Sequence, residues 1–440
     1  MTDYKLYKGT DTALTDITEF PVVAQRIEPV DTRHLLPKFM ILAGRRAGYH
    51  NAETELWYYN PGLNHDLHRR LLLTTHRVRV LSGRKGAELR AAFETWAVAN
   101  LGKRVLKTGK VLGADPEIFV QDEQGALLPA FQFLGPKKKP NHSVHAGGAT
   151  NAYWDGFQAE FDTTPVSCLA FHVDCIQNGL RTVNDAAKRH KPGAKLMLSG
   201  VVPVPDELLS TAAPEHVAFG CMPSLNAYGL HGDPSPGREV PYRFAGGHIH
   251  FGTYNLTPEQ HRDGVRGMDA FVGILTTALF GSFDSPIRRR YYGLPGEYRL
   301  PKHGVEYRTL SNAWLMHPAV THLVHELARM GFDYGLSQLD ALGPQGDIVD
   351  IIRATDPVRA KAHVERHKSA YMQLISSVSA FAPAPEAVMR VCMDGAESFV
   401  ARPDDIEANW KLRGGWTTHS DNNHACWSRA RETYSAGGKV

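Results

Sequence analysis

Residues 291–315 contain the tripeptide Glu-Tyr-Arg twice, at positions 297–299 and 306–308, separated by a Pro-Lys-His-Gly turn. In an extended strand, side chains two positions apart point to the same face, so each glutamate would share a face with its arginine. A carboxylate is a ligand for hard divalent cations and a guanidinium binds phosphate in a fork, which suits a metal and phosphate site. The residues concerned are Glu297, Arg299, Glu306 and Arg308. A salt-bridged hairpin on a solvated surface is the alternative.

A strand-like run at residues 111–120 carries Asp115 and Glu117 two positions apart. Two carboxylates on one strand face repel each other unless a cation lies between them, so this spacing indicates a metal site. Pro116 cannot donate a backbone hydrogen bond, which predicts a sheet edge, a bulge or the end of the strand. An acidic, solvent-exposed hairpin is the alternative.

Residues 153–161 contain a further source of carboxylates. Asp155 and the glycine after it favour a hairpin turn. Beyond the turn, Gln158 and Glu160 would share one strand face. The preceding residues, 135–150, form a loop rich in glycine, lysine and histidine that includes Lys138. Such a loop can close over phosphates with lysine charge and backbone N–H groups, or it can be exposed without a role.

The segment Gly-Gly-His-Ile-His-Phe-Gly at residues 246–252 is the sharpest local pattern. On a strand, His248 and His250 would point to the same side, and the flanking glycines allow close approach of a ligand or of another backbone. Contact with a metal or a phosphate is the functional interpretation. Two buried, hydrogen-bonded histidines are the alternative.

Strands and capped helices alternate around these residues. Helical periodicity predicts helices over residues 167–190, 257–280, 319–330, 357–380 and 385–400. The helix from residue 257 begins with a capping box that has proline at the first helical position. This alternation predicts an α+β protein. The predicted regions are an N-terminal mixed α/β region of unassigned role (1–107), a catalytic core (108–332) and a C-terminal helical region with a tail (333–440).

The composition is that of a large globular protein. The chain has 440 residues, of which 42% are apolar, and its net charge of +3 is spread over 49 basic and 46 acidic residues. This balance gives no field that would attract a membrane or nucleic acid, although a local contact with nucleic acid stays open. The five cysteines form no Cys-x-x-Cys pair, and no secretory leader or apolar span is present, so a cytoplasmic location is expected.

The order of the motifs is more specific than any one of them. The segments LGADPEIFV, DGFQAEF, GGHIHFG, YYGLPGEYR and GVEYRTLSNAWL, within about residues 110–330, resemble the phage-encoded carboxylate-amine ligase (amidoligase) family. That family lies in the glutamine synthetase and glutamate-cysteine ligase superfamily. The resemblance implies a curved antiparallel sheet with packed helices and, if phage-encoded, a location in the host cytoplasm. It also implies ATP and Mg2+, which Mn2+ could replace, and an acyl phosphate that an amine attacks.

The resemblance also implies roles for individual residues. The expected metal ligands are Asp115, Glu117, Glu160, His248 and Glu306. The expected catalytic arginines are Arg308 and Arg299, and the expected nucleotide contacts are His250, Arg290 and Lys138. The expected substrate contacts are Asp155, which could also be a metal ligand, and Glu297. One departure concerns Asp115, because the superfamily commonly has Glu-x-Glu where this chain has Asp-Pro-Glu.

Two other functions stay open at this point. The first is a metal-dependent hydrolase in which His248 and His250, with a carboxylate, activate water. The second is a non-catalytic binding protein that retains a ligase fold, since a fold does not fix a function. For the ligase, the expected partners are a small-molecule or peptide carboxylate and an amine, and a homo-oligomer is open.

Overall fold

The computed structural model describes most of the chain beyond residue 111 and four short segments before it. The described residues are 6–10, 13–16, 38–41, 56–58, 112–137, 152–163, 169–218, 224–233, 240–252, 256–281, 283–301, 304–337, 341–376, 384–412 and 430–440. Two compact units are present: residues 1–111 with 166–171 and 419–424, and residues 112–165 with 172–418 and 425–440. Lys138 lies outside the described residues.

The described part of the first unit is a small antiparallel sheet. Its strands are β1 (Leu6–Thr10), β2 (Ala13–Asp16), β3 (Lys38–Ile41) and β4 (Leu56–Tyr58). Their order in the sheet is β2-β1-β3-β4.

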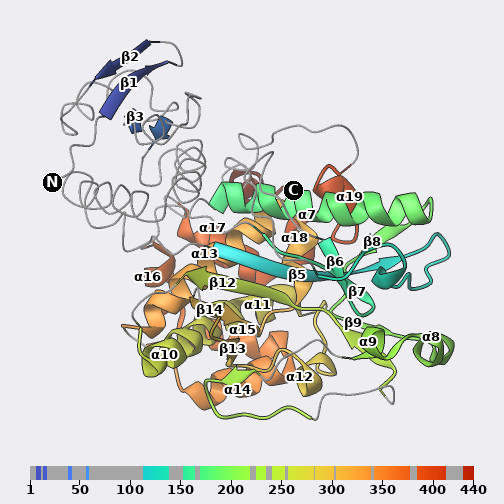
Figure 1. The fold of residues 1–440 in the computed structure, drawn as a ribbon. Helices are drawn as coiled ribbons and strands as arrows, with labels where there is room; N and C mark the ends of the chain where they lie inside the picture. The colour runs from blue at the N-terminus through green and yellow to red at the C-terminus, as the bar shows by residue number, and fades with distance from the viewer. Residues whose placement is uncertain are drawn as a thin grey trace. The chain divides into compact units, whose positions relative to one another are not determined.

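The second unit is built on a larger antiparallel sheet in the order β10-β13-β14-β12-β5-β7-β6, with β8 also paired to β5 (Figure 1). The strands are β5 (Leu112–Gln121), β6 (Ala152–Asp155), β7 (Gln158–Phe161), β8 (Lys195–Met197), β10 (Leu225–Asn226), β12 (Gly247–Gly252), β13 (Glu297–Arg299) and β14 (Gly304–Tyr307). β9 (Val201–Pro203) and β11 (Tyr242–Phe244) form a separate pair. The sheet is open, and its combination with helices confirms the predicted α+β class.

The helices of this unit account for most of the remaining described residues. They are α7 (Leu169–His190), α8 (Asp206–Thr211), α9 (Pro214–Val217), α10 (Pro258–Met268), α11 (Ile274–Phe280), α12 (Arg288–Tyr291), α13 (Pro318–Gly335), α14 (Gln345–Ala354), α15 (Pro357–Arg366), α16 (Lys368–Ser376), α17 (Pro385–Asp394), α18 (Ala396–Phe399) and α19 (Ile406–Asn409). Single turns occur at η2 (Ala130–Gln132) and η4 (Asn312–Met316), and a π-helical segment, η3 (Asp269–Gly273), joins α10 to α11. None of the helices in the described ranges combines the length and the hydropathy that a membrane crossing requires.

Local signals predict the helix beginnings better than the helix ends. The capping box at Thr257 is present, with Gln260 as its second member, as the sequence predicts. The single helices predicted over 357–380 and 385–400 are wrong, because each is divided in two. The second division falls at Gly395, whose φ of 95° is in the left-handed region that favours glycine.

Side-chain alternation gives the central sheet one apolar and one polar face. Phe251 of the apolar face packs against Phe332 of α13, with ring centroids 5.9 Å apart. Tyr307 on the same face donates a hydrogen bond to Asp269 of the π-helical segment. Helices therefore pack on the apolar face, and the polar residues of the same strands point the other way.

Pro116 lies inside the sheet rather than at its edge. β12 pairs with β5 along residues 112–116, and β7 pairs with it at Glu117 and Ile118. The proline thus lies at the end of the pairing with β12 and directly before the pairing with β7, so β5 has a neighbouring strand on each side. The edge predicted from Pro116 is wrong for this reason.

Candidate functional site

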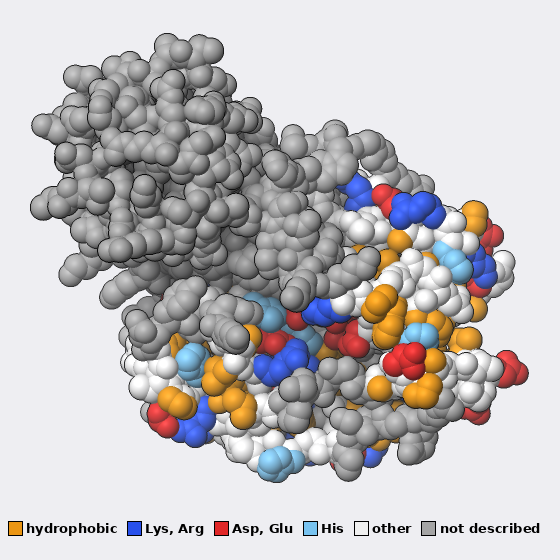
Figure 2. Space-filling model, viewed as in Figure 1, with side chains coloured by type: hydrophobic (Ala, Val, Ile, Leu, Met, Phe, Trp, Pro, Cys, Tyr) orange, Lys and Arg blue, Asp and Glu red, His pale blue; other side chains and the backbone are white. Residues whose placement is uncertain are grey.

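The strand register brings most of the residues singled out in the sequence onto the polar face. Directly opposed pairs are Arg299 with Glu306, Glu306 with His250, His248 with Asp115, and Glu117 with Glu160. Directly opposed residues of an antiparallel pair share a face, as do residues two apart on one strand. The face therefore runs continuously from β13 to β7. In space-filling view, acidic, basic and histidine side chains gather over these strands (Figure 2).

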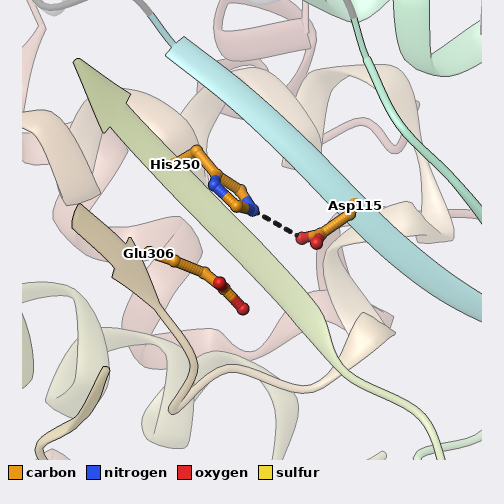
Figure 3. A group of neighbouring side chains, drawn as sticks. All are labelled: Asp115, His250 and Glu306. Atoms are coloured by element: carbon orange, nitrogen blue, oxygen red, sulfur yellow. Dashed lines mark hydrogen bonds and ion pairs between the residues drawn. The ribbon is translucent and has the colours of Figure 1, made fainter. Parts of the chain in front are cut away.

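The centre of the face is a group formed by Asp115, His250 and Glu306, one residue from each of β5, β12 and β14 (Figure 3). Nε2 of His250 lies 2.8 Å from Oδ1 of Asp115. One donor atom from each residue lies within 4.8 Å of the others. Burial alone would raise the pKa of Asp115, but the neighbouring His250 and His248 outweigh it and hold that pKa well below its usual value. Asp115 is therefore an ionised, buried ligand candidate.

His248 lies between this group and a tyrosine that the sequence does not single out. Its Nε2 is 2.7 Å from the hydroxyl of Tyr292, which in turn lies 2.7 Å from Oε1 of Glu117. Its Nδ1 is 3.6 Å from Asp115 and 3.5 Å from Glu306. Burial, with the charge of Arg308, lowers the pKa of His248 to about 4, so the ring is neutral at pH 7. The His248 ring therefore lies between the Tyr292 hydroxyl on its Nε2 side and two carboxylates on its Nδ1 side, and the direction of the Tyr292 hydrogen bond sets its tautomer.

A second group consists of Glu117, Asp155 and Glu160. Glu117 accepts hydrogen bonds from Tyr292 and from the backbone N–H of Gly246, at 2.7 and 2.6 Å. Burial, with the charge of Asp155, nevertheless raises the pKa of Glu117 to about 7. Burial and Asp115 likewise raise the pKa of Glu160 well above its usual value. Opposed carboxylates cost free energy when both are ionised, so this group favours either protons or a bound cation.

A third group combines Asp115 and Glu160 with Asp162. Asp162 and Tyr153 were not singled out in the sequence, and Lys137 was considered only as part of the lysine-rich loop at residues 135–150. Lys137 and Tyr153 both contact Glu160 and Asp162. The position of Tyr153 follows from the β6–β7 hairpin, whose turn places it opposite Glu160. Asp155, at the end of β6, pairs with Gln158 across the same turn, as the Asp-Gly signal predicts.

Two arginines bind the carboxylate of Glu306. Arg299 donates to Oε1 at 2.5 Å, and Arg308 donates to the same oxygen. Burial and Asp115 would raise the pKa of Glu306, but His248 and Arg308 outweigh them and the pKa is lowered. The salt-bridged hairpin considered for this stretch thus exists, but Glu306 and Arg308 are buried rather than solvated.

Glu297 supports Arg308 rather than pointing away from it. Oε1 of Glu297 is 3.8 Å from Nε of Arg308, and Oε2 accepts from the backbone N–H of Leu294 at 2.9 Å. Its carbonyl accepts from the Arg308 N–H at 2.9 Å. The expectation of a substrate contact at Glu297 therefore gains no support from this geometry, which favours a positioning role.

The three consecutive arginines at 288–290 differ in how deeply they are buried. Arg288 is fully buried and donates to the carbonyls of Ala245, Thr309 and Leu310. Arg290 is exposed and donates to Asp233 at 2.9 Å. The ion pair of Arg290 with Asp233 is therefore not one of the contacts on the polar face, where its nucleotide contact was expected.

The glycines that flank the histidine pair serve packing within the protein. A Cβ at Gly247 would come closer than 3.0 Å to the Trp314 ring and to the carbonyl of Ser311. A Cβ at Gly246 would meet the ring of His248. The atoms that closely approach these two glycines therefore belong to the protein itself.

The donor chemistry of the three groups fits hard divalent cations. Six carboxylates and one imidazole make up the groups, and oxygen ligands with few nitrogens suit Mg2+ or Mn2+ better than Zn2+. Glu117 and Glu160 are directly opposed in the strand register, with no arginine between them. A bound cation would offset the repulsion between these two carboxylates.

Comparison with known proteins gives one finding. Residues 237–337 match the family model described as phage phiEco32-like COOH.NH2 ligase-type 2. This segment includes β12, β13 and β14, and with them both histidines and the two Glu-x-Arg strands. The match confirms the resemblance to the carboxylate-amine ligase family. No curated protein matches the chain.

Proposed function

We propose that the protein is an ATP- and Mg2+-dependent ligase that activates a carboxylate as an acyl phosphate and joins it to an amine. The observation that carries the proposal is the continuous face on which β14, β12, β5 and β7 bring the three donor groups together, half of it within the ligase family match. A sheet of the glutamine synthetase and glutamate-cysteine ligase type is part of this proposal, with residues 108–332 as the catalytic core. The cytoplasm, where ATP is available, is the proposed location.

Two groups would hold divalent ions, Mg2+ or Mn2+. Asp115, His250 and Glu306 form the first, with His248 able to add its Nδ1 lone pair. Glu117, Asp155 and Glu160 form the second. A divalent ion held by these residues would supply Lewis acidity toward phosphate oxygens. The protein residues fix the positions of these carboxylates, since each group spans neighbouring strands.

Arg308 and Arg299 would act on the transferring phosphoryl group. Both guanidiniums meet at Glu306, and Glu297 supports Arg308 from its other side. Positive charge held in a buried place can stabilise charge that develops during phosphoryl transfer, without side-chain reorganisation. The γ-phosphoryl group would pass to the substrate carboxylate, ADP would leave, and the amine would then displace phosphate. No protein nucleophile is required.

Trapping of the activated carboxylate tests the proposal directly. The full chain is incubated with ATP, Mg2+ and a panel of small-molecule and peptide carboxylates, with hydroxylamine as the amine. We expect a hydroxamate and an equal amount of ADP, both lost in Glu306→Ala. Glu259→Ala is the matched control, because Glu259 is exposed on α10 and its contacts with Arg262 and Thr257 are local to the beginning of that helix.

Titration of ATP separates a failed substrate panel from a failed proposal. We expect ATP to bind only with Mg2+ and binding to be lost in Glu306→Ala but kept in Glu259→Ala. Folded protein that binds no ATP in either condition would overturn the ligase proposal. Release of AMP instead of ADP would replace the acyl phosphate by an acyl adenylate.

The hydrolase alternative makes a different prediction for the same protein. It requires a retained zinc ion and turnover without ATP. The carboxylate-rich donor set argues against it, because Zn2+ sites draw mainly on nitrogen and sulfur ligands. Metal analysis of the purified protein distinguishes the two.

A further inference from the structure

The ammonium group of Lys137 lies among acidic side chains at the β6–β7 end of the polar face. Nζ is 2.6 Å from the Tyr153 hydroxyl, 3.2 Å from Oδ1 of Asp162 and 3.5 Å from Oε1 of Glu160. It also lies over the Tyr153 ring, 4.5 Å from the centroid. Two carboxylates, a hydroxyl and an aromatic face are the ordinary surroundings of a bound cation.

These carboxylates are two of the three members of the third donor group. The group consists of Asp115, Glu160 and Asp162, so the lysine supplies positive charge at a place where a divalent ion could bind. The ion pairs with Glu160 and Asp162 hold the ammonium against this group.

The lysine contacts more of the third group than of the second. Its Nζ lies within 3.5 Å of Asp162 and Glu160, two of the three members of the third group, whereas in the second group Glu160 alone forms an ion pair with it. The Lys137 side chain is half exposed, and an ammonium and a divalent ion a few ångströms apart repel each other, so the two compete for this place.

We propose that the Lys137 ammonium takes the place of a third divalent ion, so that this site holds two metal ions and one lysine. The inference rests on the proposed function, since it presupposes that the other two groups bind metal. Lys137 then determines how many metal ions the site binds. It also fixes Glu160, which the second and third groups share.

The test is a titration of the full chain with Mn2+ alone, following the free ion by its paramagnetic resonance signal. Three donor groups are present among the described residues, and the lysine occupies one of them. We therefore expect the wild type to bind two ions. Lys137→Met should add a third ion, and Lys137→Arg, which keeps the charge, should bind as the wild type does. Lys191→Met is the matched control, because Lys191 forms a similar ion pair with Asp122 elsewhere.

The outcomes separate this inference from the proposed function. Three ions bound by the wild type would overturn the role of Lys137 and leave the ligase proposal standing, whether or not the variants fold. If the wild type and a folded Lys137→Met variant bind the same number of ions, the role of Lys137 is likewise overturned. No binding by any folded variant would overturn both the inference and the metal sites on which it rests.

Discussion

Glu117 and Glu160 are directly opposed across β5 and β7, and both side chains are buried. Burial raises the pKa of both, for Glu117 to about 7 with a contribution from Asp155 and for Glu160 well above its usual value. Without a cation, this pair therefore retains protons at a pH where isolated carboxylates have lost them. Metal binding and proton release should be coupled at this point of the sheet.

The first prediction is that metal affinity rises with pH. Below a pKa of about 7, a divalent ion must displace the Glu117 proton, so affinity should rise about tenfold per pH unit between pH 5.5 and 7 for each proton displaced. Titration calorimetry with Mn2+ at several pH values, in buffers of different ionisation enthalpy, measures both the slope and the proton release. Glu117→Gln should remove one proton from the count. An affinity that does not change over this interval would contradict the prediction.

The second prediction concerns stability without metal. The folded pKa of Glu117 is raised above its unfolded value of about 4.5, so the stabilising contribution is complete below pH 4.5 and is lost as the pH rises through about 7. Glutamine resembles the protonated carboxyl in shape and charge. Glu117→Gln should therefore increase the free energy of unfolding at pH 8 by about 1–3 kcal/mol and change it little at pH 5.

Urea unfolding of the metal-free protein at both pH values checks this second prediction. His248 acts in the opposite direction, because its folded pKa of about 4 lies below the unfolded value and its contribution is lost as the pH falls from about 6.5 to 4. Comparison of the variant with the wild type at one pH cancels the His248 contribution. A variant that is less stable than the wild type at pH 8 would show that Glu117 is ionised and well paired in the folded state.

Local alternation is the part of the site that could be predicted from the sequence. Asp115 and Glu117, like the two histidines, share a face because side chains two apart on a strand must do so. The α+β class and the capped helices also followed from local patterns, whereas the antiparallel sheet was implied by the family resemblance. Which strand neighbours which depends on long-range pairing, which periodicity does not contain.

The missed residues entered the site through tertiary structure. Tyr292 follows the short helix α12 and reaches Glu117 and His248, although nothing in its local sequence distinguishes it from Tyr291. The burial of Arg288 and exposure of Arg290 are likewise set by packing, because all three arginines of that run share one helical turn. Sequence patterns identified the arginine run but could not orient it.

The third prediction assigns Glu297 a positioning role toward Arg308. Glu297→Gln keeps an oxygen for the Leu294 N–H but removes the charge 3.8 Å from the guanidinium. We expect the kcat of ADP formation to fall by about tenfold with KM for ATP nearly unchanged, because a misoriented arginine weakens only the transition state. Arg308→Gln should cost about 10²–10³-fold in kcat. A Glu297→Gln variant that raises KM for the carboxylate substrate instead would favour the substrate contact that the family resemblance implies.

The fourth prediction concerns the packing that holds the histidine strand in place. A methyl group at Gly247 would overlap the buried Trp314 ring and the Ser311 carbonyl, neither of which can move without disturbing the turn after β14. Gly247→Ala should therefore lower the free energy of unfolding by about 3 kcal/mol, as overpacking of a rigid place does. Gly346→Ala is the control, because nothing lies within 4 Å of the new methyl and the position is in α14, where alanine is favoured over glycine. Thermal and urea unfolding of the two variants measure the difference; equal stability would mean that β12 and the segment after β14 are less closely packed than this geometry requires.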